Sequence, residues 1–370
     1  MAVAVLVALL TVSCGTTPTT PSTATTRASM TAGDSAIWKP QSADTSSWLR
    51  AVHFVDTQTG WTVGVDGTIL HTADGGMTWT EQASGTSTWL FGVYFTDTRT
   101  GWVVGGPLND PGEPGGGTIL HTTDGGMTWT PQASGTTATL DDVYFVDATQ
   151  GWAVGGKNND TPGVPSGIIL HTTDGGTTWT TQHTTTGHRF WSVHFVDAAT
   201  GWASGDFGMI AKTTDGGATW ESQIISTPNG SLGPIKGVQF IDANRGWAIG
   251  SAYVLGTTDG GATWPIGEPV DIGPHALFFT DANQGWVAGG LPGGAGIFHT
   301  TDGGATWQAQ SIDLEQGFVL NDLFFVDAHT GWVVGASDTS LILTTAGSGS
   351  SVRSQLYLPL VLNRSRPDAP

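Results

Sequence analysis

The feature that most constrains the fold is an internal repeat that runs through most of the 370 residues. A Gly-Trp pair occurs seven times at intervals of 39 to 50 residues, and a phenylalanine stands six positions before each glycine. The tryptophans are Trp61, Trp102, Trp152, Trp202, Trp247, Trp286 and Trp332, and the phenylalanines are Phe54, Phe95, Phe145, Phe195, Phe240, Phe279 and Phe325. Repeats of this length are typical of solenoids and propellers, in which each unit buries its hydrophobic face against the next.

Each repeat predicts four short β-strands. Val or Leu lies two residues before every one of these phenylalanines, an alternation typical of a strand. In the second repeat the predicted strands are 92–95, 101–105, 117–122 and 128–132. Four strands in a unit of about 45 residues form one blade of a β-propeller. We therefore expect an all-β fold, a single seven-bladed β-propeller with four antiparallel strands per blade, over residues 37–345.

A second motif, Thr-x-Asp-Gly-Gly-x-Thr-Trp, joins the third and fourth predicted strands in six repeats and resembles the Asp-box, or bacterial neuraminidase repeat. Its glycines supply the positive φ of a tight turn, and its carboxylate can accept backbone N–H bonds. The aspartates are Asp74, Asp124, Asp174, Asp215, Asp259 and Asp302. They are spread over six blades and lack the spacing of a calcium loop, so we interpret them as structural.

No metal and no cofactor are expected. His71, His121, His171 and His299 occupy the same position in four different repeats, whereas zinc needs three or four ligands around one ion. The single cysteine excludes an intramolecular disulfide and a cysteine-based metal cluster. The 31 acidic and 12 basic residues give a net charge of −19, which argues against nucleic-acid binding because phosphates require a basic surface.

The last blade is predicted to take its fourth strand from the other end of the chain. The seventh repeat ends at residues 341–345 without the turn motif. Residues 37–41, Ile-Trp-Lys-Pro-Gln, align with residues 78–82, Thr-Trp-Thr-Glu-Gln, at the end of the first repeat. An N-terminal strand in this place closes the ring and removes its open strand edges.

The two ends of the chain lie outside the predicted ring. Residues 1–14 resemble a bacterial lipoprotein signal, since an apolar run too short to span a bilayer leads to Cys14, the residue that would carry the lipid. An ordinary secretory signal is the alternative. Residues 15–36 form a Thr/Pro/Ser-rich tether, and residues 346–370 a Gly/Ser hinge with a short apolar tail. We expect an exported protein, held at the outer face of the cell membrane by its lipid or otherwise secreted.

Loop lengths divide the propeller into a constant face and a variable face. The turn between the first and second strands and the turn of the Asp motif keep their lengths in every copy, whereas the other two connections vary. Function usually resides in variable loops on a rigid scaffold. The variable face carries two insertions that contain Asn109, Asp110, Glu113, Asn158, Asn159 and Asp160.

The repeat also stops being repetitive four residues before each phenylalanine, where the innermost strand begins. These positions hold Arg50, Phe91, Asp141, Trp191, Lys236, His275 and Asn321. We predict that these seven residues, called here the ring residues, surround the mouth of the central channel and bind a partner. The alternative is sequence drift at exposed positions.

The complete repeat reads Phe-x-Asp-x-x-x-Gly-Trp-x-x-Gly followed by Gly-x-Ile-Leu-His-Thr-x-Asp-Gly-Gly-x-Thr-Trp, as in residues 54–79 and 95–129. It resembles the photosystem II stability and assembly factors of oxygenic phototrophs and their bacterial relatives. The resemblance covers residues 37–345 and implies a non-catalytic, exported or lipid-anchored propeller that binds a protein partner, such as a membrane complex during its assembly. It also implies an arginine-rich binding patch, for which the ring residues offer Arg50 and Lys236.

A sialidase-like glycoside hydrolase or a carbohydrate-binding propeller is the alternative function, with a glycan as the partner. Sialidases use a tyrosine nucleophile with a carboxylate, and three arginines that hold the substrate carboxylate. The predicted ring holds only Arg50, Arg99, Arg189 and Arg245, of which two lie in the short turns. Tyr94 and Tyr144 lie inside inner strands, so we expect no enzyme. In the carbohydrate-binding alternative, Trp48, Trp89 and Trp191 would be stacking platforms.

Overall fold

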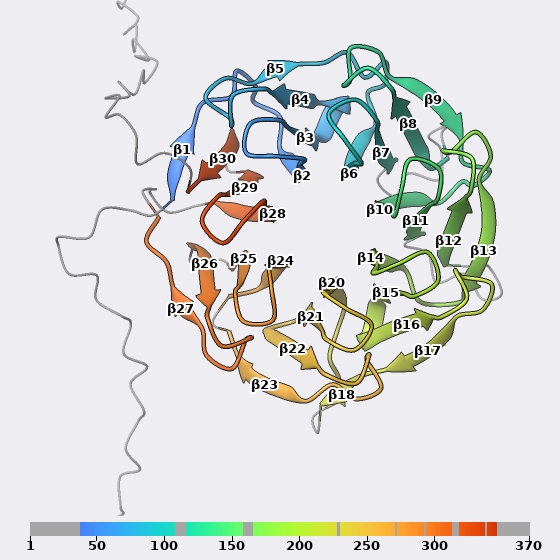
Figure 1. The fold of residues 1–370 in the computed structure, drawn as a ribbon, viewed down its shortest axis with the longest axis vertical. Coiled ribbons are helices and arrows are strands. Elements are labelled where there is room, and N and C mark those ends of the chain that lie inside the picture. Colours follow the sequence, from blue (N-terminus) through green and yellow to red (C-terminus); the bar gives the residue numbers. More distant parts are fainter. Residues whose placement is uncertain are drawn as a thin grey trace, which may run out of the picture. The chain divides into compact units, whose positions relative to one another are not determined.

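The computed structural model describes residues 38–107, 116–157, 166–227, 230–270, 272–291, 294–312, 318–336 and 339–345. These residues form seven four-stranded antiparallel sheets, arranged as blades around a central channel (Figure 1). The predicted seven-bladed β-propeller is confirmed. Within the described residues, helix is limited to two 3-10 turns, η1 (Val65–Gly67) and η2 (Asp206–Gly208). None of the helices in this part of the chain is long and apolar enough to cross a membrane.

The strands follow one another outward from the channel in every blade. Blades one to three are β2 (Leu49–Phe54), β3 (Gly60–Gly64), β4 (Ile69–Thr72) and β5 (Thr80–Glu81); β6 (Trp89–Phe95), β7 (Gly101–Gly106), β8 (Thr118–Thr122) and β9 (Thr130–Ala133); and β10 (Thr139–Phe145), β11 (Gly151–Gly156), β12 (Gly167–Thr172) and β13 (Thr180–Thr185). Blade four is β14 (Phe190–Phe195), β15 (Gly201–Gly205), β16 (Met209–Thr213) and β17 (Glu221–Ile224), followed by a small hairpin of β18 (Ser226–Thr227) and β19 (Gly230–Ser231).

Blades five and six continue the same order. They are β20 (Ile235–Phe240), β21 (Gly246–Gly250), β22 (Tyr253–Thr257) and β23 (Ile266–Pro269); and β24 (Pro274–Phe279), β25 (Gly285–Leu291), β26 (Gly294–Thr300) and β27 (Gln308–Ala309). Blade seven consists of β28 (Val319–Phe325), β29 (Gly331–Ala336), β30 (Ser340–Thr344) and β1 (Lys39–Gln41).

The repeated Phe and Trp residues form one packing unit between neighbouring blades. Each phenylalanine stacks flat on the Gly-Trp tryptophan of the preceding blade, with ring centroids 3.5 to 3.8 Å apart in all seven cases. The outer tryptophan of its own blade meets it edge-on, at 5.7 to 6.0 Å. Each such aromatic pair adds about 0.5–1.5 kcal/mol of stabilisation beyond that from the area it buries. The repeated Phe and Trp residues are therefore explained largely by packing between blades.

The glycine of each Gly-Trp pair makes room for this phenylalanine. Phe54 lies opposite Gly60 in the pairing of β2 with β3. A Cβ on Gly60 would lie 2.4 Å from the Phe54 ring, which is closer than packed carbon atoms come. The aromatic ring therefore lies flat over the glycine backbone, and a larger residue there would displace it.

Hydrogen bonds to the turn of the Asp motif join one blade to the next, as blades one and two show. Trp61 Nε1 and Gln82 Nε2 of blade one both donate to the carbonyl oxygen of Gly125 in blade two, at 3.2 and 2.8 Å. In return, Trp129 Nε1 of blade two donates to Gln82 Oε1 at 3.3 Å. The glycine carbonyl belongs to the Asp motif, which explains why this turn recurs at the boundary between blades.

The N-terminal strand closes the ring as predicted. Strand β1 pairs antiparallel with β30, with Lys39 opposite Thr344 and Gln41 opposite Ile342. Trp38 is fully buried, and its Nε1 donates to Gln310 Oε1 of blade six at 2.7 Å. Trp38 thus stands where the outer tryptophan stands in the other blades.

We predict that Trp38→Ala destabilises the protein by about 3–5 kcal/mol, because it empties a buried site at the boundary between blades six and seven. Trp48→Ala is the matched control, since the Trp48 side chain is 47% exposed. Chemical denaturation of the full chain measures both. A cost for Trp38→Ala no larger than that for Trp48→Ala would contradict closure by the N-terminal strand.

Candidate functional site

The seven ring residues come together around one cavity of about 200 Å³ at the mouth of the channel. It is lined by the first residues of the innermost strands β2, β6, β10, β14, β20, β24 and β28. All seven predicted residues line it: Arg50, Phe91, Asp141, Trp191, Lys236, His275 and Asn321. They come from seven different repeats, so the closed ring alone brings them within reach of one ligand.

Every ring residue is the extra residue of a β-bulge. In blade one, Leu49 pairs with Gly64 and Ala51 pairs with Val63, so Arg50 has no partner on β3. The same skip occurs at the ring position of the other six blades. A bulged residue leaves the strand ladder and its side chain is re-aimed. The last glycine of Gly-Trp-x-x-Gly belongs to this bulge, because a Cβ on Gly64 would lie 2.1 Å from the carbonyl oxygen of Trp48.

Two cations of the mouth, Arg50 and Lys236, have no carboxylate partner in the described part of the chain. The ion pair found there joins Arg189 to Asp141. The Arg50 guanidinium lies 5.1 Å from the centre of the Trp89 ring, and its buried Nε makes no hydrogen bond. Burial, and next the charge of Arg50, lower the pKa of Lys236. The two positive charges therefore repel each other across the mouth, and an anionic group placed between them would reduce this repulsion.

His275 adds a neutral polar group to the same side. Its Nδ1 lies 3.0 Å from the carbonyl oxygen of Leu320. Burial, together with the charges of Lys236 and Arg50, lowers the pKa of His275. The ring is therefore uncharged at neutral pH, and the Nδ1–H donates to Leu320, leaving Nε2 as an acceptor.

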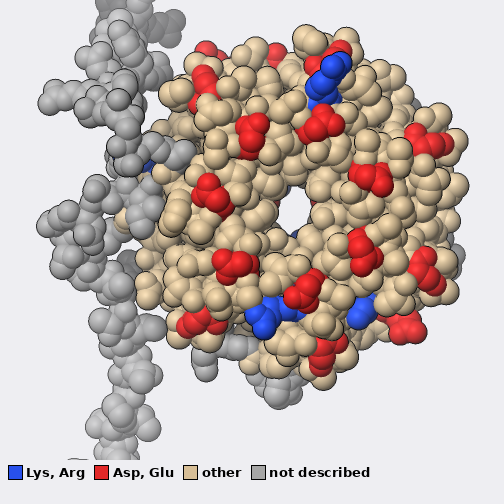
Figure 2. Space-filling model, in the orientation of Figure 1, with Lys and Arg blue, Asp and Glu red and all other residues tan. Residues whose placement is uncertain are grey.

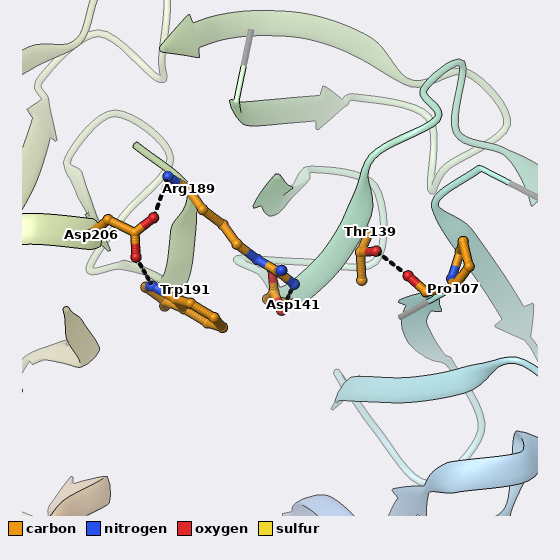
Figure 3. A network of polar contacts seen from close by, with 6 residues as sticks. All are labelled: Pro107, Thr139, Asp141, Arg189, Trp191 and Asp206. Atoms are coloured by element: carbon orange, nitrogen blue, oxygen red, sulfur yellow. Dashed lines mark hydrogen bonds and ion pairs between the residues drawn. The ribbon is translucent and has the colours of Figure 1, made fainter. Parts of the chain in front are cut away.

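The opposite side of the mouth is held rigid by a network of four residues (Figure 3). The Arg189 guanidinium binds both carboxylate oxygens of Asp141, and the two side chains are only 4% and 7% exposed. The guanidinium also lies 4.5 Å from the centre of the Trp191 ring. Asp206 accepts hydrogen bonds from the Arg189 backbone N–H at 2.9 Å and from Trp191 Nε1 at 2.8 Å. Asp141 is therefore committed to an internal ion pair, and Trp191 is fixed in one orientation.

Two further carboxyls line the cavity that the repeat pattern did not single out. Asp142 accepts backbone N–H bonds from Val143 and Val193, and Asp322 accepts them from Leu323 and Val52. Each therefore ties its own blade to the next. Burial raises the pKa of Asp142 to about 6 and that of Asp322 to about 7. The sequence does mark these two aspartates, because the other five blades have the small residues Ala, Gly or Ser at this position.

The constant face differs from the mouth in its charge. Figure 2 shows acidic side chains encircling the channel opening, with few lysines or arginines among them. In the Asp motif, Asp124 Oδ1 accepts hydrogen bonds from Thr122 Oγ1 and the Thr128 N–H, and Oδ2 accepts one from Thr128 Oγ1. The hydrogen bonds from Thr128 and Thr122 lower the pKa of Asp124 to about 2. The other five copies make the same three bonds, so each carboxylate is occupied within its own turn.

Some predicted residues lie outside the described part of the chain. They are the insertion residues Asn109, Asp110, Glu113, Asn158, Asn159 and Asp160, and the lipidation candidate Cys14. In the part of the chain that the structure describes, no cluster of three or more His, Cys, Asp or Glu residues could hold a metal ion.

A comparison with known protein families identifies the family of the chain. Residues 30–133 and 129–230 match the family described as photosynthesis system II assembly factor YCF48. The chain belongs to this family. A search of curated proteins found no match.

Two solved structures of YCF48 share the fold of this protein. "YCF48 bound to D1 peptide" is 22% identical, with a TM-score of 0.64 over 85% of this chain and 99% of that chain. YCF48 from Cyanidioschyzon merolae is 22% identical, with a TM-score of 0.64 over 83% of this chain and 98% of that chain. A xyloglucanase of family GH74 from Xanthomonas campestris is 9% identical, with a TM-score of 0.62 over 83% of this chain and 53% of that chain. At these identities the likeness is one of fold.

The buried carboxyls of the mouth predict a pH-dependent contribution to stability. Because burial raises the pKa of Asp322 to about 7, the folded protein binds this proton more tightly than the unfolded chain. Its contribution to the free energy of unfolding is therefore greatest at low pH and declines as the pH rises from about 4 to 7. Buried His53 and His194, whose pKa values fall to about 3 and 4, act in the opposite direction.

The prediction therefore concerns the difference between two proteins. The gap in Tm between the wild type and Asp322→Asn should be larger near pH 4.5 than near pH 7.5, because only the wild type gains from the protonated carboxyl. Thermal melts at both pH values measure it. A gap that stays constant or widens with pH would show that the pKa of Asp322 is not raised.

Proposed function

We propose that this protein is a non-catalytic assembly factor that holds a segment of a partner protein at the mouth of its channel. The observation that carries the proposal is the contrast between a repeating scaffold and its non-repeating bulges. Seven bulged side chains, all different, converge on one cavity, whereas the aromatic stacks beneath them are nearly identical in all blades. Rigid presentation of varied side chains is the arrangement that recognition requires.

The size and charge of the cavity indicate the class of ligand. A volume of about 200 Å³ is below the roughly 300–1,000 Å³ of sites that enclose drug-sized molecules, and it suits one or two side chains of an extended polypeptide. Arg50 and Lys236 have no carboxylate partner in the described residues, so an acidic side chain or a chain terminus would complete the site. A peptide is also the ligand named for one structural relative, "YCF48 bound to D1 peptide".

The carboxyls of the mouth give no support to glycoside hydrolysis. A glycosidase needs one carboxyl to protonate the leaving group and a second to attack or to activate water. Here Asp141 is bound by Arg189, and Asp142 and Asp322 accept backbone hydrogen bonds from the next blade. All three are occupied in holding blades together.

The carbohydrate-binding alternative also gains little from the rim tryptophans. Arg50 lies 5.1 Å from the Trp89 ring centre, and Arg189 lies 4.5 Å from that of Trp191. A guanidinium already covers one face of each ring, which reduces the aromatic surface that a sugar could stack on. Trp48 remains an exposed platform.

We predict that the full chain, immobilised and exposed to a phage-displayed pool of random peptides, enriches peptides rich in Asp and Glu. Arg50→Gln/Lys236→Gln should abolish this enrichment, because it removes the unpaired positive charges of the mouth. Arg99→Gln/Arg245→Gln is the matched control, since it removes the same charge from the short turns of the constant face. Equal enrichment by the wild type and by the mouth variant would contradict the proposal.

We also propose that the protein is exported and anchored by a lipid on Cys14, on the basis of the apolar run that ends at this residue. Expression in a bacterium fed an alkyne fatty acid should label the wild type and place it in the membrane fraction. Cys14→Ala should lose the label, because it removes the only thiol of the chain. Labelling that persists in Cys14→Ala, or a wild type that is exported without label, would contradict the anchor.

A further inference from the structure

Phe207 is an aromatic residue in an unfavourable backbone conformation. Its φ is +54°, and its side chain is 54% exposed. The left-handed region favours Gly, Asn and Asp, and a bulky residue there is a rare outlier that costs about 1–3 kcal/mol. Exposure of the phenyl ring forgoes the burial that usually rewards an aromatic side chain.

Other blades show that the loop does not require an aromatic residue. In the same connection, blade one has Asp66 at φ +56° and blade five has Ser251 at φ +54°. Turn η1 around Asp66 and turn η2 around Phe207 share their form, since a glycine follows the left-handed residue in both. A small polar residue therefore suits the backbone conformation of this turn, which does not require an aromatic residue at position 207.

The position of Phe207 associates it with the channel mouth. It follows Asp206, whose carboxylate holds Trp191 Nε1 and the Arg189 backbone N–H. The His188 ring meets Phe207 edge-on, with centroids 5.7 Å apart. The residue before Phe207 in the loop, Asp206, is thus hydrogen-bonded to Trp191, which lines the cavity (Figure 3).

We propose that Phe207 and Trp191 form a rigid aromatic anchor for an apolar side chain of the bound acidic peptide segment. The proposal rests on the function proposed above and specifies its partner: a peptide with a carboxylate at Arg50 and Lys236 and an apolar residue beside blade four. Charge complementarity across the mouth supports this occupant, because the unpaired cations lie in blades one and five, whereas in blade four Arg189 is neutralised by Asp141. Trp191, whose orientation is fixed in advance by its hydrogen bond to Asp206, loses little entropy on binding, which is the property of an interface hot spot.

The decisive variant is Phe207→Asn, because asparagine tolerates a positive φ and carries no charge. It should raise the Tm slightly, by about 2 °C, through relief of strain. In the same phage selection, it should enrich acidic peptides without the aromatic and large aliphatic residues that the wild type also enriches. The affinity of the best wild-type peptide, made synthetically, should fall about tenfold.

Ile224→Asn is the matched control, since Ile224 is 53% exposed on the outer strand of the same blade. It should leave both the selected peptides and their affinity unchanged. A fall in the Tm of Phe207→Asn would show that Phe207 serves the fold, and unchanged apolar enrichment would show that it does not contact the ligand. Either result overturns the anchor.

The selection separates this inference from the function on which it rests. Acidic peptides without apolar preference on the wild type would refute the anchor and support the proposed function. Apolar peptides without acidic residues would refute the charge-based part of the function and support the anchor. A wild type that enriches nothing would refute both.

Discussion

The structure depends on the stack of each phenylalanine between two tryptophans. Phe54 shows the pattern, with the flat face of Trp332 from the preceding blade on one side and the edge of Trp79 from its own blade on the other. Because each flat Phe–Trp stack joins neighbouring blades, the regular spacing of these residues in the sequence reflects the order of the blades in the ring. The Phe54 ring lies so close to Gly60 that the position has no room for a side chain, which explains the glycine of each Gly-Trp pair. Interfaces of this kind repeat round a closed ring, in which blade seven packs on blade one through the stack of Phe54 on Trp332.

This constraint also creates the candidate binding site. The stacks hold the innermost strands in one register, and a bulge in each strand releases one residue from pairing just before the channel mouth. The strand pairing therefore does not determine which residue stands there, and the seven positions hold seven different residues. In this chain the ring positions supply two cations without a carboxylate partner in the described residues, the Asp141 of a buried ion pair, and the Trp191 ring, which is hydrogen-bonded to Asp206.

The sequence predicts the architecture well, because it follows from residues whose spacing repeats. The same spacing identifies the seven residues that line the cavity at the channel mouth, whereas their role in binding stays a prediction. The ring position stands out in the sequence because seven different residues occupy it within a regular repeat. The chemistry of the site was less visible, because it depends on contacts between different repeats. Arg189 and Asp141 are 48 residues apart, and nothing local marks them as partners. Asp322 reaches the backbone of Val52 only after the ring has closed, and the positive φ of Phe207 occurs where no glycine signals it.

The most direct measurement of the central claim is a structure of the full chain with an acidic peptide bound. We expect the peptide to lie in the cavity of the variable face, with a carboxylate between Arg50 and Lys236. A peptide seated on the acidic constant face, or along an outer strand away from the mouth, would contradict it.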